Sequence, residues 1–148
     1  MMGPLMQRAA KLSDLDRLEQ LWLHAVANSH PSLPRQFWLD RIGLFRTDCS
    51  NAKRCRVFTG RHSAVAEAFI TVTGDDRIAY LCVSPLFSGC GIATNLLTEA
   101  TRDIPKLQAQ VLRENLRTRY FLQRQGFKEQ ERDYRAEFGQ HLILMGCG

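Results

Sequence analysis

Hydrophobic positions near the start of the chain recur every three or four residues, the spacing of one face of a helix. This stripe comprises Leu15, Leu18, Leu21, Trp22, Ala25 and Val26. Ser13 precedes it, with Asp16 three residues later, which predicts Ser13 as the N-cap of the helix. His30-Pro31 ends the pattern.

A second helical pattern follows at residues 34–45, where Pro34 suits the first turn. Its apolar positions are Phe37, Trp38, Ile42 and Phe45. Residues 48–53 are polar and are predicted to form a loop.

Runs rich in β-branched and aromatic residues predict strands at 56–59, 65–73 and 77–83. Turn residues separate them at 60–63 and 74–76, so these three strands are predicted to be antiparallel. Residues 5–9 predict a short first strand.

The second half of the chain alternates helices and strands. Apolar residues at helical spacing predict a helix at 91–103, and residues 107–112 predict a strand parallel to 77–83, because a helix joins the two. Asn115 is the predicted N-cap of a helix that ends near Gln125, with Gly126 at C′. Strands at 127–132 and 141–145 complete a mixed, mostly antiparallel sheet of about seven strands. Helices cover both faces of this α/β fold.

Length and composition fit one domain, residues 1–148, with a sizeable core. The chain is 45% hydrophobic and 24% charged, as in ordinary globular proteins, and lacks an apolar run of about 18 residues that could span a membrane. The N-terminal residues do not resemble a secretory signal. A cytoplasmic location is expected, with no membrane partner.

The cysteine pattern indicates neither disulfides nor zinc. The five cysteines, Cys49, Cys55, Cys82, Cys90 and Cys147, are odd in number and form no C-x-x-C pair. Reduced thiols and no metal are therefore predicted. Cys90 precedes a predicted helix, a position that can lower a thiol pKa, although an ordinary unreactive thiol is favoured.

The net charge of +5 leaves more than one class of anionic partner open. Four arginines lie close together at 113, 117, 119 and 124. They form either a solvated helix face, a phosphate contact or a nucleic-acid surface. No helix-turn-helix pattern or aromatic-rich RNA signature is present, so a nucleic-acid partner is not expected.

The stretch from Tyr80 to Asn95 carries the most specific signal. A short apolar strand is stopped by Pro85, and Gly89 and Gly91 then precede a helix. A helix N-terminus offers unpaired N–H groups and partial positive charge, and glycines let an anion approach them. The pattern allows a phosphate or pyrophosphate site, but for a G-x-G alone an ordinary helix start is the favoured interpretation.

The run V-x-P-x-x-x-G-x-G-h-A from Val83 to Ala93 resembles the acetyl-CoA pyrophosphate loop of the GCN5-related N-acetyltransferase (GNAT) family. A second block, with Asn115, Phe121 and Gly126-Phe127, resembles that family's N-x-x-A-x-x-F-Y-x-x-x-G-F segment. The two blocks stand in the family's order and cover the second half of the chain.

The resemblance implies an acetyl-CoA-dependent N-acetyltransferase that moves an acetyl group to an amine of a small molecule or protein by direct attack. It implies that the 80–83 and 107–112 strands splay apart around the pantetheine, and that a backbone N–H near Leu81 or Cys82 stabilises the oxyanion. An acyl-Cys82 route is less favoured. The residues that it assigns to the cofactor are Leu81, Cys82, Val83, Ser88, Gly89, Cys90, Gly91, Ile92, Ala93, Thr94, Asn115 and Phe121. The resemblance also allows a homodimer.

Two positions depart from the family pattern. Ser88 stands where the family usually has Gln or Arg, and Leu122 stands where a tyrosine often protonates the departing thiolate. These departures support an alternative, a catalytically weak or inactive acyl-CoA-binding protein. A basic nucleic-acid-binding module is a third interpretation.

The catalytic residues are not assigned by the sequence. Glu67, Tyr80 and Tyr120 are candidates for proton transfer, and Tyr134 or water are alternatives. The region of the first two helices usually forms a wall of the acceptor site in the family, which makes His24, His30 and Trp38 candidates for contact with substrate.

Overall fold

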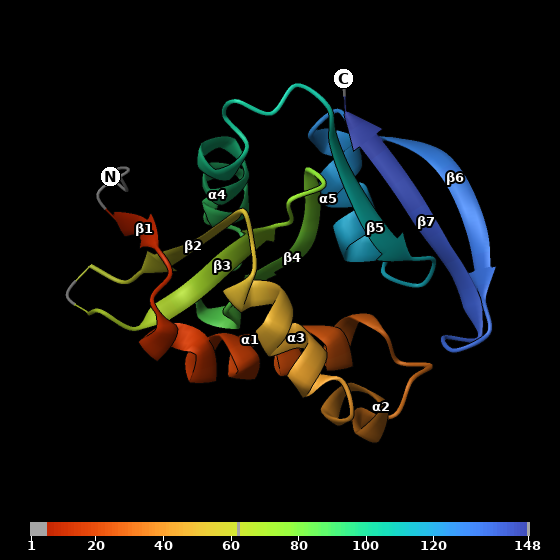
Figure 1. Ribbon diagram of the computed structural model, residues 1–148, viewed down its shortest axis with the longest axis horizontal. Helices are drawn as coiled ribbons and strands as arrows, with labels where there is room; N and C mark the ends of the chain where they lie inside the picture. The colour runs from red at the N-terminus through yellow and green to blue at the C-terminus, as the bar shows by residue number, and fades with distance from the viewer. Residues whose placement is uncertain (1–5, 62, 148) are drawn as a thin grey trace.

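One seven-stranded mixed sheet organises the protein, as the pattern of strands predicts. The computed structural model describes residues 6–61 and 63–147, and Figure 1 shows the sheet with strand order β1-β2-β3-β4-β5-β7-β6. The strands are β1 (Gln7–Ala9), β2 (Arg54–Thr59), β3 (Ala66–Val72), β4 (Arg77–Val83), β5 (Leu107–Leu112), β6 (Lys128–Arg135) and β7 (Gln140–Cys147). Neighbouring strands are antiparallel except β4 and β5, which are parallel. Residue 5 of the predicted first strand lies outside the described residues.

Helices cover both faces of the sheet, which confirms the predicted layers (Figure 1). The α-helices are α1 (Leu15–Ser29), α2 (Arg35–Leu39), α3 (Ile42–Ser50), α4 (Ile92–Ala100) and α5 (Leu116–Arg124). Successive residues of β3 point to opposite faces. Phe69 packs with α1 and α3, and Ile70 packs with α4 and α5, so each face has its own buried cluster.

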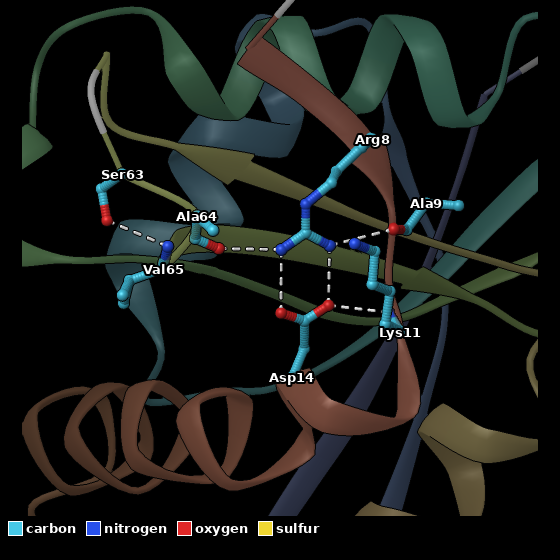
Figure 2. A network of polar contacts seen from close by, with 7 residues as sticks. All are labelled: Arg8, Ala9, Lys11, Asp14, Ser63, Ala64 and Val65. Atoms are coloured by element: carbon cyan, nitrogen blue, oxygen red, sulfur yellow. Dashed lines mark hydrogen bonds and ion pairs between the residues drawn. The ribbon is translucent and has the colours of Figure 1, made fainter.

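The start of α1 differs from the prediction. Asp14, not Ser13, is the N-cap residue, and a 3-10 turn (Leu12–Asp14) precedes the helix. The Asp14 carboxylate accepts a hydrogen bond from the Lys11 N–H at 2.7 Å and pairs with both terminal nitrogens of Arg8 at 2.7 and 2.9 Å (Figure 2). Because Arg8 also donates to the Ala64 carbonyl at 2.9 Å, this network joins β1 to the β2–β3 connection.

The single helix predicted for residues 34–45 is wrong. The structure divides it into α2 and α3, and α3 continues through Ser50 into the predicted loop. At the break, the Asp40 N–H bonds to the Gln36 carbonyl at 3.0 Å and the Arg41 N–H bonds to the Trp38 carbonyl at 2.9 Å, a tighter turn that ends α2. The division lets two aromatic rings pack on Trp22 in different orientations. The Trp38 ring is perpendicular to the Trp22 ring at a centroid distance of 6.0 Å, and the Phe45 ring is stacked on it at 4.6 Å.

The remaining elements agree closely with the predictions. Asn115 is the N-cap of α5, since its Oδ1 accepts the Thr118 N–H at 3.2 Å, and Gly126 follows the helix with φ +94°. Helix α4 ends at Ala100, and β6 and β7 are longer than predicted. No helix in the described residues is long and apolar enough to cross a membrane.

Candidate active site between β4 and β5

The parallel strands β4 and β5 separate after two residue pairs. They pair only at Arg77 with Gln108 and at Ile78 with Ala109. Beyond this point β4 stays paired with β3 as far as Val83, and β5 stays paired with β7 as far as Leu112. The facing edges of β4 and β5 therefore diverge, as the family resemblance implies.

The backbone of β4 presents alternate residues to this gap. The Ser84 N–H donates to the Glu67 carbonyl of the β3 side at 2.8 Å. Because backbone groups alternate along a strand, Cys82 also bonds toward β3, whereas the N–H and C=O groups of Leu81 and Val83 face the gap. The β3–β4 pairing skips Ala79, since Thr71 pairs with Tyr80 and Val72 pairs with Ile78.

A cavity of about 710 Å³ occupies the divergence. Its walls come from β4, β5, the turn before α4, the inner face of α5, and α1 to α3. A cavity of this size suits a ligand larger than an amino acid.

The glycine turn lies at one end of the cavity. Gly89 and Gly91 have φ of +79° and +76°, a left-handed conformation that favours glycine. Gly91 is the N-cap of α4 and supplies no side chain to cap it. The first helical bond runs from the Asn95 N–H to the Gly91 carbonyl, so the N–H groups of residues 92–94 precede it without helical acceptors.

The space in front of these donors is open. A Cβ added at Gly89 or Gly91 would meet no atom of the described residues within 4 Å. Ser88, Gly89, Ile92 and Ala93 line the cavity directly. The turn is therefore shaped and charged to hold an anionic group at the end of the cavity.

Helix α5 adds polar and cationic groups on the same side. Asn115, Phe121 and Leu122 line the cavity, as do Arg117 and Arg124. Neither of these two arginines makes an ion pair within the part of the chain that the structure describes. Both side chains are exposed at the cavity, so a phosphate contact and a solvated helix face both remain open.

A carboxylate and a tyrosine lie on the α1–α3 side of the cavity. The Tyr80 hydroxyl of β4 donates to the Asp48 carboxylate of α3 at 2.7 Å, and both residues line the cavity. Burial, followed by the hydrogen bond to Asp48, raises the Tyr80 pKa well above its ordinary value. The tyrosine is therefore protonated, and it holds the Asp48 carboxylate beside β4. The sequence placed Asp48 in a loop and did not identify it as a site residue.

His30 and Trp38 also line the cavity, in contact with each other at a centroid distance of 5.0 Å. His30 is buried, and its Nδ1 lies 3.0 Å from the Val26 carbonyl oxygen. Burial lowers the His30 pKa, so the ring is neutral at pH 7 and Nδ1 carries the proton. The indole Nε1 of Trp38 is buried without a hydrogen-bond acceptor in the described residues. His24 lines the same wall and contacts Asn28.

Two of the candidates for proton transfer, Glu67 and Tyr120, do not line the cavity. The Glu67 carboxylate pairs with Arg17 at 2.6 Å, and Tyr120 is 52% exposed on the outer side of α5. Neither residue is part of the cavity wall.

Cys82 lines the cavity, but burial raises the pKa of its thiol to about 12, which disfavours an acyl-cysteine. No group of three or more His, Cys, Asp or Glu residues in the described ranges could hold a metal ion.

Comparisons with known proteins agree with this geometry. No family model matches the chain. Peptidyl-lysine N-acetyltransferase YiaC of Escherichia coli (strain K12) is 27% identical over 123 residues, 82% of each chain. Among solved structures, apo YjaB from Escherichia coli has a TM-score of 0.80 at 20% identity and 95% coverage of both chains. PaiA N-acetyltransferase from Thermoplasma acidophilum, in complex with coenzyme A, has a TM-score of 0.76 at 15% identity, covering 95% of this chain and 96% of that one.

The protein thus has the fold of an acyltransferase with a divided central sheet. This is the fold of the GCN5-related N-acetyltransferases, which the glycine turn and the Asn115 block resemble in sequence. The name of the relative YiaC supports the predicted N-acetyltransferase activity, and the alternative of an inactive acyl-CoA-binding protein is not favoured.

Proposed function

We propose that this protein transfers the acetyl group of acetyl-CoA to the side-chain amine of lysine in a peptide or protein. The observation that carries the proposal is the β4–β5 cavity, which has a glycine turn for an anion at one end and, beside β4, the Asp48 carboxylate, which is bonded to the Tyr80 hydroxyl and has no cationic partner among the described residues.

The cofactor end fits acetyl-CoA through backbone groups. The N–H groups at the start of α4 and the open space before Gly91 suit the pyrophosphate, without help from the Ser88 side chain. The gap-facing amides of Leu81 and Val83 suit the pantetheine arm. Acetyl-CoA supplies the acetyl group as a thioester.

The acceptor end fits a primary amine on an apolar stem. Asp48 makes no ion pair within the described chain, so its carboxylate can attract an ammonium group. Trp22, Trp38 and Leu44 line the adjoining wall and can cover the methylenes of lysine. The relative YiaC is named as a peptidyl-lysine N-acetyltransferase, which favours lysine among amines.

The proposal is tested by incubating the protein with acetyl-CoA and a lysine-containing peptide. Acetyl-CoA-dependent acetylation of the lysine is expected in the peptide mass, together with release of free thiol. Asp48→Asn should raise the KM for the peptide and leave coenzyme A affinity unchanged. Asp40→Asn is the matched control, because Asp40 is exposed and outside the cavity wall. Acetylation absent at every peptide concentration, from protein that binds acetyl-CoA, would refute lysine transfer.

A further inference from the structure

Helix α3 places three side chains in a row along the acceptor wall. Its N-cap residue Arg41, Leu44 and Asp48 stand at positions i, i+3 and i+7, which share one helix face. All three line the cavity. The row therefore offers a cation at one end, an apolar middle and a carboxylate at the end next to β4.

The Arg41 guanidinium is fixed by aromatic contacts and not by a carboxylate. Its central carbon lies 3.7 Å above the Phe37 ring and 5.6 Å from the centre of the Phe138 ring, which the β6–β7 hairpin supplies. No ion pair or side-chain hydrogen bond of Arg41 occurs within residues 6–61 and 63–147. A guanidinium held over a ring, without a carboxylate partner, keeps N–H groups available for a carboxylate.

Arg41 and Asp48 do not neutralise each other. Seven residues of helix separate their backbones by about 10 Å at 1.5 Å per residue. Exposed Leu44, with 59% of its surface accessible, lies between them. A ligand that satisfies both charges must carry a cation and an anion separated by an apolar stretch of similar length.

A lysine with an acidic neighbour has this arrangement. If the ammonium group lies at Asp48, a carboxylate one or two residues along the peptide can reach Arg41, because consecutive Cα atoms are about 3.8 Å apart and the two side chains add the remainder. Leu44 would contact the apolar stem between the two charges.

We propose that Arg41 is a specificity-determining residue that selects lysines with an Asp or Glu one or two residues away. This inference rests on the proposed function and narrows its substrate class. It assigns Arg41 to recognition of the acceptor and gives it no part in acetyl transfer.

The test compares three otherwise identical peptides, in which the residue after the lysine is Asp, Asn or Arg. The wild-type protein is expected to prefer the Asp peptide to the Asn peptide by about tenfold in kcat/KM, as one charge-assisted hydrogen-bonded pair provides. Arg41→Gln should remove this preference, and Arg41→Glu should favour the Arg peptide. Arg41→Lys keeps the charge but loses the planar stack on Phe37, so part of the preference should remain.

Arg35→Gln is the matched control, because Arg35 is an exposed arginine of α2 outside the cavity wall, and it should keep the wild-type preference. Peptide affinity, measured by calorimetry with coenzyme A present, provides a readout separate from turnover. Equal acetylation of the three peptides by the wild-type protein would overturn the role of Arg41 and leave lysine acetylation standing. If no peptide is acetylated, the proposed function fails, and equal affinities for the three peptides would then overturn the role of Arg41 as well.

Discussion

Gly91 provides the most direct test of the proposed cofactor site. It is the N-cap of α4, with φ +76°, and the space where its side chain would be is open. The substitution Gly91→Glu places a carboxylate in front of the same N–H groups that we assign to the pyrophosphate. The new side chain would compete for those donors and repel the incoming anion.

The cost to the fold is limited by the open space. Because no atom of the described chain lies within 4 Å of the added Cβ, the main penalty is the left-handed backbone conformation, about 1–2 kcal/mol. For a protein of this size, that penalty lowers the midpoint of thermal unfolding by roughly 2–8 °C. The variant should therefore remain folded.

The assay is thermal unfolding with and without coenzyme A, supported by calorimetric titration. At about 100 times its Kd, a ligand adds about 2.7 kcal/mol to the free energy of unfolding, which raises the midpoint by roughly 5–10 °C. The wild-type protein should show this increase. Gly91→Glu should show none at the same ligand concentration.

Gly139→Ala is a control for backbone strain. Gly139 also has positive φ, +65°, and open space at its Cβ, but it lies in the β6–β7 hairpin. The control should lose similar stability and keep the full response to coenzyme A. A folded Gly91→Glu variant with wild-type affinity would refute the assignment of the pyrophosphate to this turn.

Three further changes test other parts of the structure. Leu122→Tyr puts a hydroxyl on the cavity wall at the family's tyrosine position and should raise kcat, by up to about 10²-fold; an unchanged kcat in a folded variant would show that another proton donor already serves. Asp14→Asn should lower the free energy of unfolding by about 2 kcal/mol at pH 7, because it leaves Arg8 without its partner. The Arg8 hydrogen bond holds the Asp14 pKa below its ordinary value, so this stability is present above about pH 4 and is lost as the pH falls through the folded-state pKa; a difference between wild type and variant that does not shrink as the pH falls below 4 would contradict the assignment. Glu114→Ala should raise the KM of the lysine peptide without changing coenzyme A affinity, since the Glu114 carboxylate accepts the Ser32 N–H at 3.1 Å and fixes the loop beside His30; equal KM values would show that the loop needs no such contact.

Local sequence signals predicted the conformation of the glycine turn and of the start of α5. The run from Val83 to Ala93 combines a strand stop, two glycines and a helix start, all within eleven neighbouring residues. The conformation of such a segment depends mainly on its own residues, because only glycine adopts the required positive φ readily. The agreement at Asn115 has the same origin, since a cap bonds within its own helix.

The acceptor side could not be predicted in this way, because it depends on contacts between distant segments. Neither Asp40 nor Arg41, where α2 ends and α3 begins, is a glycine or proline, Gly43 alone is a weak break signal, and the i, i+7 spacing of Trp38 and Phe45 favours one continuous helix. The two aromatic side chains instead pack against Trp22 in different orientations. That packing moves Arg41 to the start of α3 and Asp48 onto a helix, where both face the cavity.

The same contacts restrict the sources of the proton that acetyl transfer must return to the departing thiolate. Tyr80 lines the cavity, but its hydroxyl hydrogen is donated to Asp48, and its raised pKa makes it a weak acid. Leu122 has no proton to donate, and Tyr120 lies outside the cavity wall. Among these positions, none combines access with an available proton, so we expect water in the cavity to supply it. If water supplies the proton, Leu122→Tyr should raise turnover and Tyr80→Phe should leave it unchanged. A loss of turnover in Tyr80→Phe would instead identify Tyr80 as the proton donor.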